Sequence, residues 1–360
     1  MASDWSLNQP RAWRVFESWI YADRLPNAIL LCGPSGTGKR KMAINIASTL
    51  LCQGESVFSC KTCSSCKKVD TLSHTDLRLL LPSLVTDGKR STERTSGYEH
   101  VKAYLNGRLF EYSGISIEQV RELQNEMVYT PRENNRKVAI LFESELMHQA
   151  AANSLLKMLE EPSQNCFFIL VTAYPERLLS TVFSRCQRLP LYPLNKADLR
   201  DELRKMDVDA NSRELSVRLS QGSLVKAQEI LKGDLDEIRT AVETFIESGL
   251  LHRDGFFWEI VEKISKKKGR NYQFDFLELC AFYLRDFFLI KNQEIDLITM
   301  IDRKDYLNSL VSYWKEEQID NGVQILDQGI ESLQRNVSFD LVIVDFWRHL
   351  RHLGSKKRFI

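Results

Sequence analysis

The chain has 360 residues, of which 43% are hydrophobic and 27% are charged, and this composition is typical of a globular protein with two or three domains. Its 49 Lys and Arg residues nearly balance its 48 Asp and Glu residues, which excludes a polycation, so any contact with DNA requires a local basic patch. The N-terminal residues lack the order of a secretory peptide, and no apolar run reaches the roughly 18 residues that span a bilayer. We therefore expect a cytoplasmic protein.

The first half of the chain alternates apolar runs with helical patterns. Three short runs predict buried strands of a parallel sheet, namely Ala28–Cys32, Val138–Phe142 and Cys166–Val171. Helical spacing follows the first run at Lys41–Leu51 and the second at Gln149–Leu159, where Pro162 ends the pattern. This alternation predicts an α/β fold with a doubly wound parallel sheet.

The second half is predicted to be helical. Asn195 is a capping residue for a helix that continues through Met206, and helical patterns then extend almost to the end. Plausible linkers lie at Gly233–Asp236 and Lys266–Asn271. The polar, glycine-containing segment Val85–Gly114 favours an insertion or a mobile loop over an active-site lid.

A glycine-rich loop, Gly33-Pro-Ser-Gly-Thr-Gly-Lys39, follows the first predicted strand and opens a helix. Gly33, Gly36 and Gly38 allow backbone amides to face a phosphate, and the helix N-terminus adds positive potential. Lys39 would reach the outer phosphates of a nucleotide. The strand before the loop and the helix after it indicate a true phosphate-loop fold.

Both expected magnesium contacts of this loop are missing. Arg40 follows Lys39 where a Ser or Thr hydroxyl would bind the ion, and a guanidinium cannot do so. Phe142 stands where an Asp would end the second strand, with Glu143 after it. Because phosphoryl transfer depends on the metal, we predict that hydrolysis is lost and magnesium is not bound. The loop is then either a scaffold turn or a weak site for ATP or ADP.

Four cysteines, Cys52, Cys60, Cys63 and Cys66, lie within fifteen positions. Cys-x2-Cys steps bring thiolates to one tetrahedral ion, and four protein ligands leave no open position, so we predict a structural zinc site. An iron–sulfur cluster remains the alternative. A zinc-dependent DNA-binding module is a weaker interpretation, because few lysines accompany the cysteines.

Three further motifs, together with the cysteines, resemble the bacterial clamp-loader family of AAA-plus proteins. These motifs are Asp23–Lys39, Ala150–Pro162, and Pro175–Cys186 with its Ser-Arg-Cys sequence, and the resemblance extends from about Leu25 to Lys232. It implies an AAA-plus domain at 1–190 with a zinc module at 52–66, an all-α lid at 191–245 and an all-α collar at 246–360. The apolar stripe from about Phe274 would then pack in the collar.

Within this family, the gamma/tau type hydrolyses ATP, whereas the delta-prime type keeps the fold and zinc without the ATPase residues. Arg40, Phe142 and Val225, the last in place of the lid arginine, favour the delta-prime type. The resemblance implies that Arg185 acts in trans as an arginine finger at a neighbouring ATP site, and that Thr172 occupies the sensor position. It also implies gamma/tau and delta subunits as partners in a heteropentamer that loads the sliding clamp on primer-template DNA.

The alternative is an active gamma/tau-like ATPase with an atypical magnesium site built on Glu143 or Glu145. Basic residues offer candidates for DNA contact within the assembly, although ordinary surface charge would look the same. They are Arg132 and Arg136 with Lys137, and the tail Lys356–Arg358.

Overall fold

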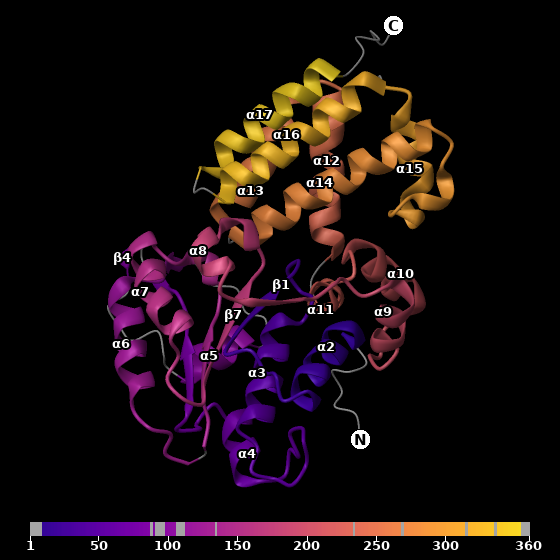
Figure 1. Cartoon of the computed structure of the whole chain (residues 1–360). Coiled ribbons are helices and arrows are strands. Elements are labelled where there is room, and N and C mark those ends of the chain that lie inside the picture. The colour runs from indigo at the N-terminus through magenta and orange to yellow at the C-terminus, as the bar shows by residue number, and fades with distance from the viewer. Residues whose placement is uncertain are drawn as a thin grey trace, which may run out of the picture. The chain divides into compact units, whose positions relative to one another are not determined.

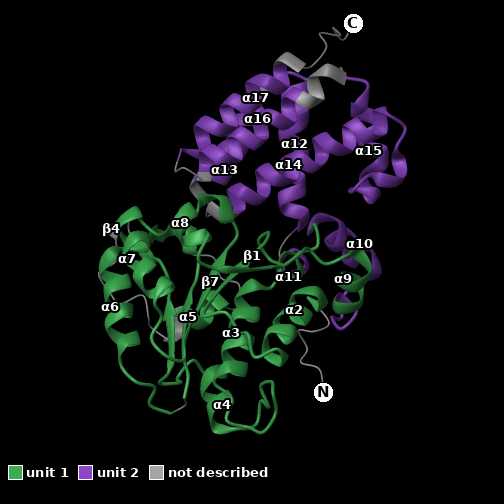
Figure 2. Ribbon diagram, in the orientation of Figure 1, with its two compact units in different colours: residues 1–202, 221–226 green, residues 203–220, 227–360 purple. Residues whose placement is uncertain are grey.

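The computed structural model describes residues 9–86, 89–90, 98–105, 112–133, 135–232, 235–267, 270–313, 316–334 and 337–353. The chain divides into two compact units, of which unit 1 contains residues 1–202 and 221–226, and unit 2 contains residues 203–220 and 227–360 (Figure 2). Each unit has its own hydrophobic core. The division into three domains stays a prediction.

A five-stranded parallel sheet forms the centre of unit 1. Its strand order is β2-β6-β7-β1-β8, with the bounds Leu77–Leu80, Lys137–Leu141, Cys166–Thr172, Ala28–Cys32 and Gln187–Pro190. The three predicted strands are β1, β6 and β7, which are buried throughout. Strands β2 and β8 were not predicted, because they are short and partly exposed and so lack an uninterrupted apolar run.

Helices cover both faces of this sheet (Figure 1). Alternate residues of β1 point to opposite faces, so Ile29 and Leu31 pack with one set of helices and Ala28 and Leu30 with the other. The first set is α2 (Pro10–Tyr21), α3 (Lys39–Leu50), α4 (Ser64–Asp70) and α5 (Tyr98–Leu105); the second is α6 (Ile117–Val128), α7 (Gln149–Glu160) and α8 (Ser180–Phe183). The predicted α/β fold class is thereby confirmed.

The segment 85–114 contains regular structure. Strands β3 (Ser83–Thr86), β4 (Lys89–Arg90) and β5 (Tyr112–Gly114) form a small antiparallel sheet in the order β4-β3-β5. Between β4 and β5, α5 buries Val101 and Tyr104. The mobile-loop prediction is therefore wrong for the described part of this segment, because apolar contacts fix a helix that the polar composition concealed.

Helices follow the last strand, as predicted. They are α9 (Lys196–Leu203), α10 (Ala210–Leu219), α11 (Leu224–Lys232), α12 (Leu235–Leu250), α13 (Asp254–Lys267), α14 (Arg270–Lys291), α15 (Lys304–Val311), α16 (Glu316–Gln334) and α17 (Phe339–Leu353). Short 3-10 helices lie at Ser144–Leu146 (η1), Pro175–Arg177 (η2), Ile295–Leu297 (η3) and Ile301–Arg303 (η4). None of the helices in the described ranges has the length and apolar character needed to cross a membrane.

Two predicted linkers in this half were placed too broadly. The helix α12 already begins at Leu235, and α13 and α14 leave only residues 268–269 outside the described helices. The predicted apolar stripe lies on α14, where Leu277 and Leu284 are fully buried in the core of unit 2.

Candidate functional site

The phosphate loop joins the carboxyl end of β1 to the N-terminus of α3. Gly36 and Gly38 adopt positive φ angles of 76° and 87°, which side-chain-bearing residues rarely adopt. A Cβ atom on Gly36 would also lie 1.7 Å from Oγ of Ser223, which begins the turn into α11. The loop therefore needs glycine both for its backbone path and for this close packing.

Lys39 is folded back onto the loop that precedes it. Its Nζ donates hydrogen bonds to the carbonyl oxygens of Gly33 (2.6 Å) and Pro34 (2.7 Å), and the residue is only 7% exposed. Burial lowers the pKa of Lys39 to about 8, although the carboxylates of Glu143 and Glu145 act in the opposite direction. Among the described residues, no carboxylate lies within ion-pair distance of this ammonium group.

Arg40, the residue that follows the loop lysine, binds Glu143 and Tyr104. One guanidinium nitrogen lies 2.9 Å from Oε1 of Glu143, and the other donates to the backbone oxygen of Tyr104 at 2.9 Å. The guanidinium carbon lies 3.7 Å from the centroid of the Tyr104 ring, which is cation–π geometry. The Tyr104 hydroxyl donates to the same carboxylate oxygen at 2.5 Å.

Phe142 completes this cluster from the end of β6. It is fully buried, and its ring centroid lies 5.2 Å from that of Tyr104. Arg40 and Phe142 stand at the two positions where the sequence analysis expected magnesium-binding residues. Both therefore contact the same tyrosine. Sequence reasoning missed Tyr104 because it lies in the polar segment, and no motif marked it.

Glu145 and Thr172 meet behind the loop. Oε1 of Glu145 accepts a hydrogen bond from the backbone N–H of Ala173 at 3.3 Å, whereas its Oε2 is buried without a hydrogen-bond partner. Burial raises the pKa of Glu145. Thr172 is fully buried, and its hydroxyl oxygen accepts from the N–H of Tyr174 at 3.0 Å. These bonds give both side chains a structural role at the end of β7.

The four cysteines form a cluster with the geometry of a metal site. All four Sγ atoms lie within 4.8 Å of one another, and the pairs Cys52–Cys63 and Cys60–Cys66 are each 4.0 Å apart. A tetrahedral zinc ion with Zn–S bonds of about 2.3 Å has sulfur–sulfur edges of about 3.8 Å, so small side-chain movements would bring the four sulfur atoms to that size.

Backbone N–H groups donate hydrogen bonds to the sulfur atoms of these ligands. The Sγ of Cys52 accepts from the N–H of Cys60 at 3.4 Å, and the Sγ of Cys63 accepts from the N–H of Cys66 at 3.4 Å. A hydrogen bond from Thr62 lowers the pKa of Cys60 to about 5, whereas burial raises that of Cys66 to about 12. The predicted ligands are thus brought together, and His74 is not among the group.

Glu133 connects the cysteine module to the rest of unit 1 by hydrogen bonds. Lys68 donates to this carboxylate at 2.5 Å and Thr75 at 2.6 Å, while Gln53 donates to the Glu133 backbone oxygen at 2.8 Å. The hydrogen bonds from Lys68 and Thr75 lower the pKa of Glu133 to about 2. The residue after Cys52 and the segment after Cys66 are therefore both bound to Glu133.

Arg185 lies on the surface, between α8 and β8. It forms an ion pair with Glu160 at the end of α7, and it donates to the backbone oxygen of Thr181 at 2.9 Å. Its side chain is 34% exposed, whereas the adjacent Cys186 is buried. Both contacts are made by the guanidinium group of Arg185, and the side chain is still partly accessible to solvent.

One of the basic candidates for DNA contact does not belong on the surface. Lys137 is only 3% exposed, and its Nζ donates to the backbone oxygens of Glu126 (2.6 Å) and Tyr129 (3.0 Å). Arg136, with which Lys137 was grouped, is exposed. The ammonium group of Lys137 instead binds backbone oxygens at the C-terminal end of α6. The tail 356–358 lies outside the described residues.

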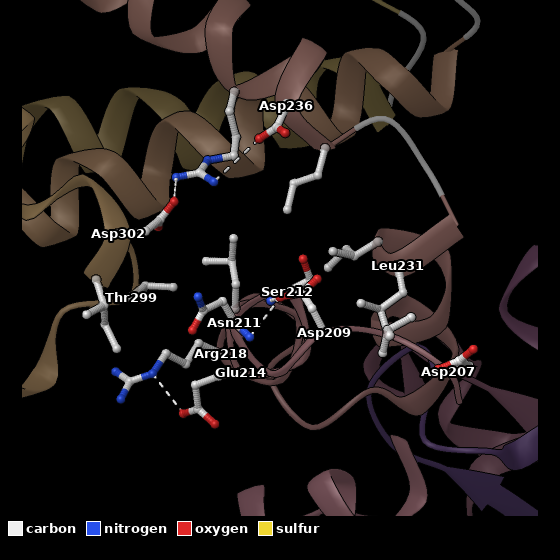
Figure 3. Close-up of a pocket in the computed structure, with 16 residues that line it drawn as sticks. Asp207, Asp209, Asn211, Ser212, Glu214, Arg218, Leu231, Asp236, Thr299 and Asp302 are labelled. Atoms are coloured by element: carbon white, nitrogen blue, oxygen red, sulfur yellow. Dashed lines mark hydrogen bonds and ion pairs between the residues drawn. The ribbon is translucent and has the colours of Figure 1, made fainter. Parts of the chain in front are cut away.

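A cavity of about 870 Å³ lies in unit 2, lined by residues from α10 and the segment before it, from α11 and α12, and from η4 and Thr299 (Figure 3). Its lining pairs charges internally: Arg239 contacts Asp302 at 2.7 Å, and Arg218 contacts Glu214 at 3.1 Å. Asp209 accepts from two backbone N–H groups at the start of α10. None of the predicted site residues lines this cavity.

Comparison with known proteins identifies related sequences. The family model described as "DNA polymerase III, delta subunit" matches residues 8–195. The DNA polymerase III subunit delta' of Bacillus subtilis (strain 168) is 32% identical over 239 residues, covering 65% of this chain and 63% of that protein. Its counterpart in Pseudomonas aeruginosa is 34% identical over 220 residues, covering 60% and 59%. The chain thus matches less than two thirds of the length of either relative.

More distant similarities accompany these. The DNA polymerase III subunit tau of Bacillus subtilis is 26% identical over 219 residues, covering 61% of this chain and 33% of that protein. Among solved structures, a DNA polymerase III gamma-subunit-related protein of Thermotoga maritima is 17% identical with a TM-score of 0.44, covering 94% of this chain and 99% of the other.

Proposed function

Because the chain belongs to the DNA polymerase III delta-subunit family, we propose that it is a delta-prime-type, non-hydrolysing subunit of the clamp loader. In this role it helps to load the sliding clamp onto primed DNA in the cytoplasm. Its partners are gamma/tau and delta subunits in a heteropentamer, and it meets primer-template DNA through that assembly. The relatives named subunit delta' support this choice over the gamma/tau type.

The observation that carries the proposal is the contact of Arg40 with Glu143 and Tyr104. A phosphate-loop ATPase holds magnesium with a hydroxyl after the loop lysine and a carboxylate at the end of a strand. In this chain, a guanidinium and a buried phenyl ring occupy these positions. Without the ion, the charge that develops during phosphoryl transfer is not neutralised, so the subunit does not turn over ATP.

The proposed positive contribution of the subunit is Arg185. A guanidinium is always charged and planar, which suits it to stabilise a transferring phosphoryl group. Its partly exposed side chain and its place in the Ser-Arg-Cys motif support a role at the ATP site of a neighbouring subunit, for which the guanidinium would have to leave Glu160. On the proposed assignment, Arg185 is the catalytic residue in trans, although this subunit is not itself an ATPase.

Reconstitution of the loader tests this role. Removal of an arginine finger slows phosphoryl transfer at its site by about 10³-fold or more. Arg185→Ala should therefore abolish the share of DNA-stimulated ATP turnover that this site contributes, while native mass spectrometry still detects the assembled complex. Arg188→Ala, a matched loss of an exposed arginine on β8, should leave turnover unchanged. Normal turnover in the Arg185→Ala complex would refute the trans role.

The alternative of an active ATPase needs Glu143 or Glu145 to hold magnesium. Glu143 is already bound by Arg40 and Tyr104, while Glu145 is buried, with one oxygen bound by the N–H of Ala173 and the other without a partner. These contacts argue against the alternative. Purified protein should accordingly show no magnesium-dependent ATP hydrolysis, and turnover comparable with that of a gamma/tau subunit would reverse the assignment.

The cysteine cluster is proposed to hold zinc as a structural ion. Cys52, Cys60, Cys63 and Cys66 supply a complete tetrahedral set, so the ion would have no open position for a substrate. Its chemistry there is to neutralise the thiolates and hold the segment between α3 and α4 in one conformation.

A further inference from the structure

We propose that Glu160 restrains Arg185 in the free subunit: its carboxylate holds the guanidinium against the subunit's own surface, and the arginine acts in trans only after it is released. This inference rests on the proposed trans role of Arg185 and adds the regulation of that role. It also connects two motifs that the sequence analysis identified separately, because Glu160 lies in Ala150–Pro162 and Arg185 lies in Pro175–Cys186.

The first step is the direction of the guanidinium group. Its Nη2 atom forms the ion pair with Oε1 of Glu160, the last residue of α7, and its Nη1 atom donates to the carbonyl oxygen of Thr181 in α8 at 2.9 Å. Among the described residues, Glu160 is the one carboxylate in ion-pair contact with Arg185. Both ends of the guanidinium fork are thus bound within the subunit, so the fork can bind a phosphoryl group only after it has left Glu160.

The second step is the strength of the ion pair. The side chains of Arg185 and Glu160 are 34% and 46% exposed, so water weakens their attraction and solvates both groups once they separate. Exposed pairs of this kind shift an equilibrium by about two- to fivefold. A phosphoryl group carries more negative charge and more acceptor oxygens than one carboxylate, so it can replace Glu160 as the partner of the guanidinium.

The third step is that the neighbours of Arg185 confine the change to its side chain. Oγ of Ser184 donates to the same carbonyl oxygen of Thr181 at 3.2 Å, so this acceptor keeps a partner when the guanidinium leaves. Cys186 is buried in the core of unit 1 and fixes the backbone on the other side. Release therefore needs only rotation about the side-chain bonds of Arg185, and each residue of the Ser-Arg-Cys motif has its own function.

Chemical modification of the free, full-length chain tests the restraint without any partner. Phenylglyoxal reacts with the deprotonated form of a guanidinium group, and an ion pair with a carboxylate favours the protonated form, which slows the reaction. Glu160→Gln should therefore increase the rate of modification at Arg185 by about two- to fivefold, measured by tandem mass spectrometry of the digested chain. Arg188, an exposed arginine on β8, should react at an unchanged rate in the same sample.

Matched variants show whether the effect belongs to this carboxylate. Glu161→Gln removes the next negative charge, just after the end of α7, and should leave the rate at Arg185 unchanged. Glu160→Asp keeps the charge on a shorter side chain and should give a rate between those of wild type and Glu160→Gln. Raising the ionic strength should speed the modification of Arg185 in wild type and have less effect in Glu160→Gln, because salt screens the ion pair.

The reconstituted loader connects the restraint to turnover. In Glu160→Gln, the cost of breaking the ion pair no longer adds to the barrier of phosphoryl transfer. The kcat for the share of DNA-stimulated ATP turnover at the neighbouring site should therefore rise by about two- to fivefold, with KM unchanged. Glu161→Gln should leave both parameters at their wild-type values.

Two results would overturn the inference. One is an unchanged modification rate at Arg185 in Glu160→Gln. The other is turnover in the Glu160→Gln complex that does not rise: an equal rate would mean that the ion pair has no part in the reaction, and a fall would mean that Glu160 positions the active arginine. Normal turnover in the Arg185→Ala complex is a separate failure, because it refutes the trans role while the modification rates still report whether Glu160 holds Arg185 in the free chain.

Discussion

The two ends of helix α3 carry contrasting sites. After its C-terminal end, Cys52 and the three cysteines that follow keep a complete ligand set within 4.8 Å. At its N-terminal end, the phosphate loop has its glycines and Lys39, and we propose that Arg40 and Phe142 stand there in place of metal-binding groups. The difference teaches that phosphate binding and metal binding are separable, because backbone amides serve the first and two particular side chains serve the second.

The largest effect on stability is expected from a change in the cysteine cluster, after the C-terminal end of α3. Cys63→Ser removes one thiolate and also the sulfur that accepts from Cys66 N–H at the start of α4. Structural zinc contributes about 10–16 kcal/mol of apparent binding energy in small zinc-finger peptides, so loss of the ion should lower stability by several kcal/mol. Elemental analysis and thermal unfolding measure both consequences.

A control and a contrary result sharpen this test. Cys32→Ala changes a buried cysteine at the end of β1, outside the cluster, and should keep one zinc ion per chain. Iron with visible absorbance in the wild-type protein would instead favour the iron–sulfur alternative. A full complement of zinc in Cys63→Ser would remove that residue from the ligand set.

The second effect is a pH-dependent change in stability caused by Lys39, at the other end of the helix. Its pKa is lowered to about 8 in the folded state, against a usual value near 10.5. Between these values the unfolded chain binds more protons than the folded one, so this residue's contribution to stability rises with pH from about 8 to 10.5. Below pH 8 both states are charged, and the cost of burying the ammonium group is fully present.

Comparison of the wild type with Lys39→Met separates the contribution of Lys39 to stability from that of other groups that titrate at alkaline pH. The methionine variant should be more stable than wild type near pH 7 by up to about 3 kcal/mol, from about 1.4 kcal/mol for each pKa unit. This advantage should shrink by pH 10. Chemical denaturation at several pH values, without phosphate in the buffer, measures it; an advantage that does not change with pH would contradict the lowered pKa.

The sequence predicted features that depend on local patterns. The strands β1, β6 and β7 were evident because each is a continuous apolar run, and the cysteine cluster because Cys-x2-Cys steps constrain geometry by themselves. The loss of the magnesium ligands stays a prediction, and it rests on the identities of Arg40 and Phe142 alone.

The contacts that replaced those ligands were not predictable, because they join residues far apart in the chain. Tyr104 lies 64 positions from Arg40 and 39 from Glu143, inside a segment whose polar composition indicated a loop. Lys137 shows the same limit, because its neighbours Arg132 and Arg136 suggested a basic surface. Only the fold reveals that its ammonium group binds backbone oxygens at the C-terminal end of α6.

The smallest effect concerns the coupling between Arg40 and Glu143, which distinguishes a stabilising pair from an accidental contact. Both side chains are about a quarter exposed, at 24% and 22%, so the pair should be worth more than a surface salt bridge and less than a fully buried one. A double-mutant cycle of Arg40→Met and Glu143→Gln should give a coupling energy of about 1–2 kcal/mol. The same cycle in Tyr104→Phe should give a smaller value, because the hydroxyl no longer holds the carboxylate in place. A coupling energy near zero in the wild-type background would mean that the guanidinium does not take over the position of the metal ion, and the phosphate loop would then differ from the cysteine cluster by simple loss of its ligands.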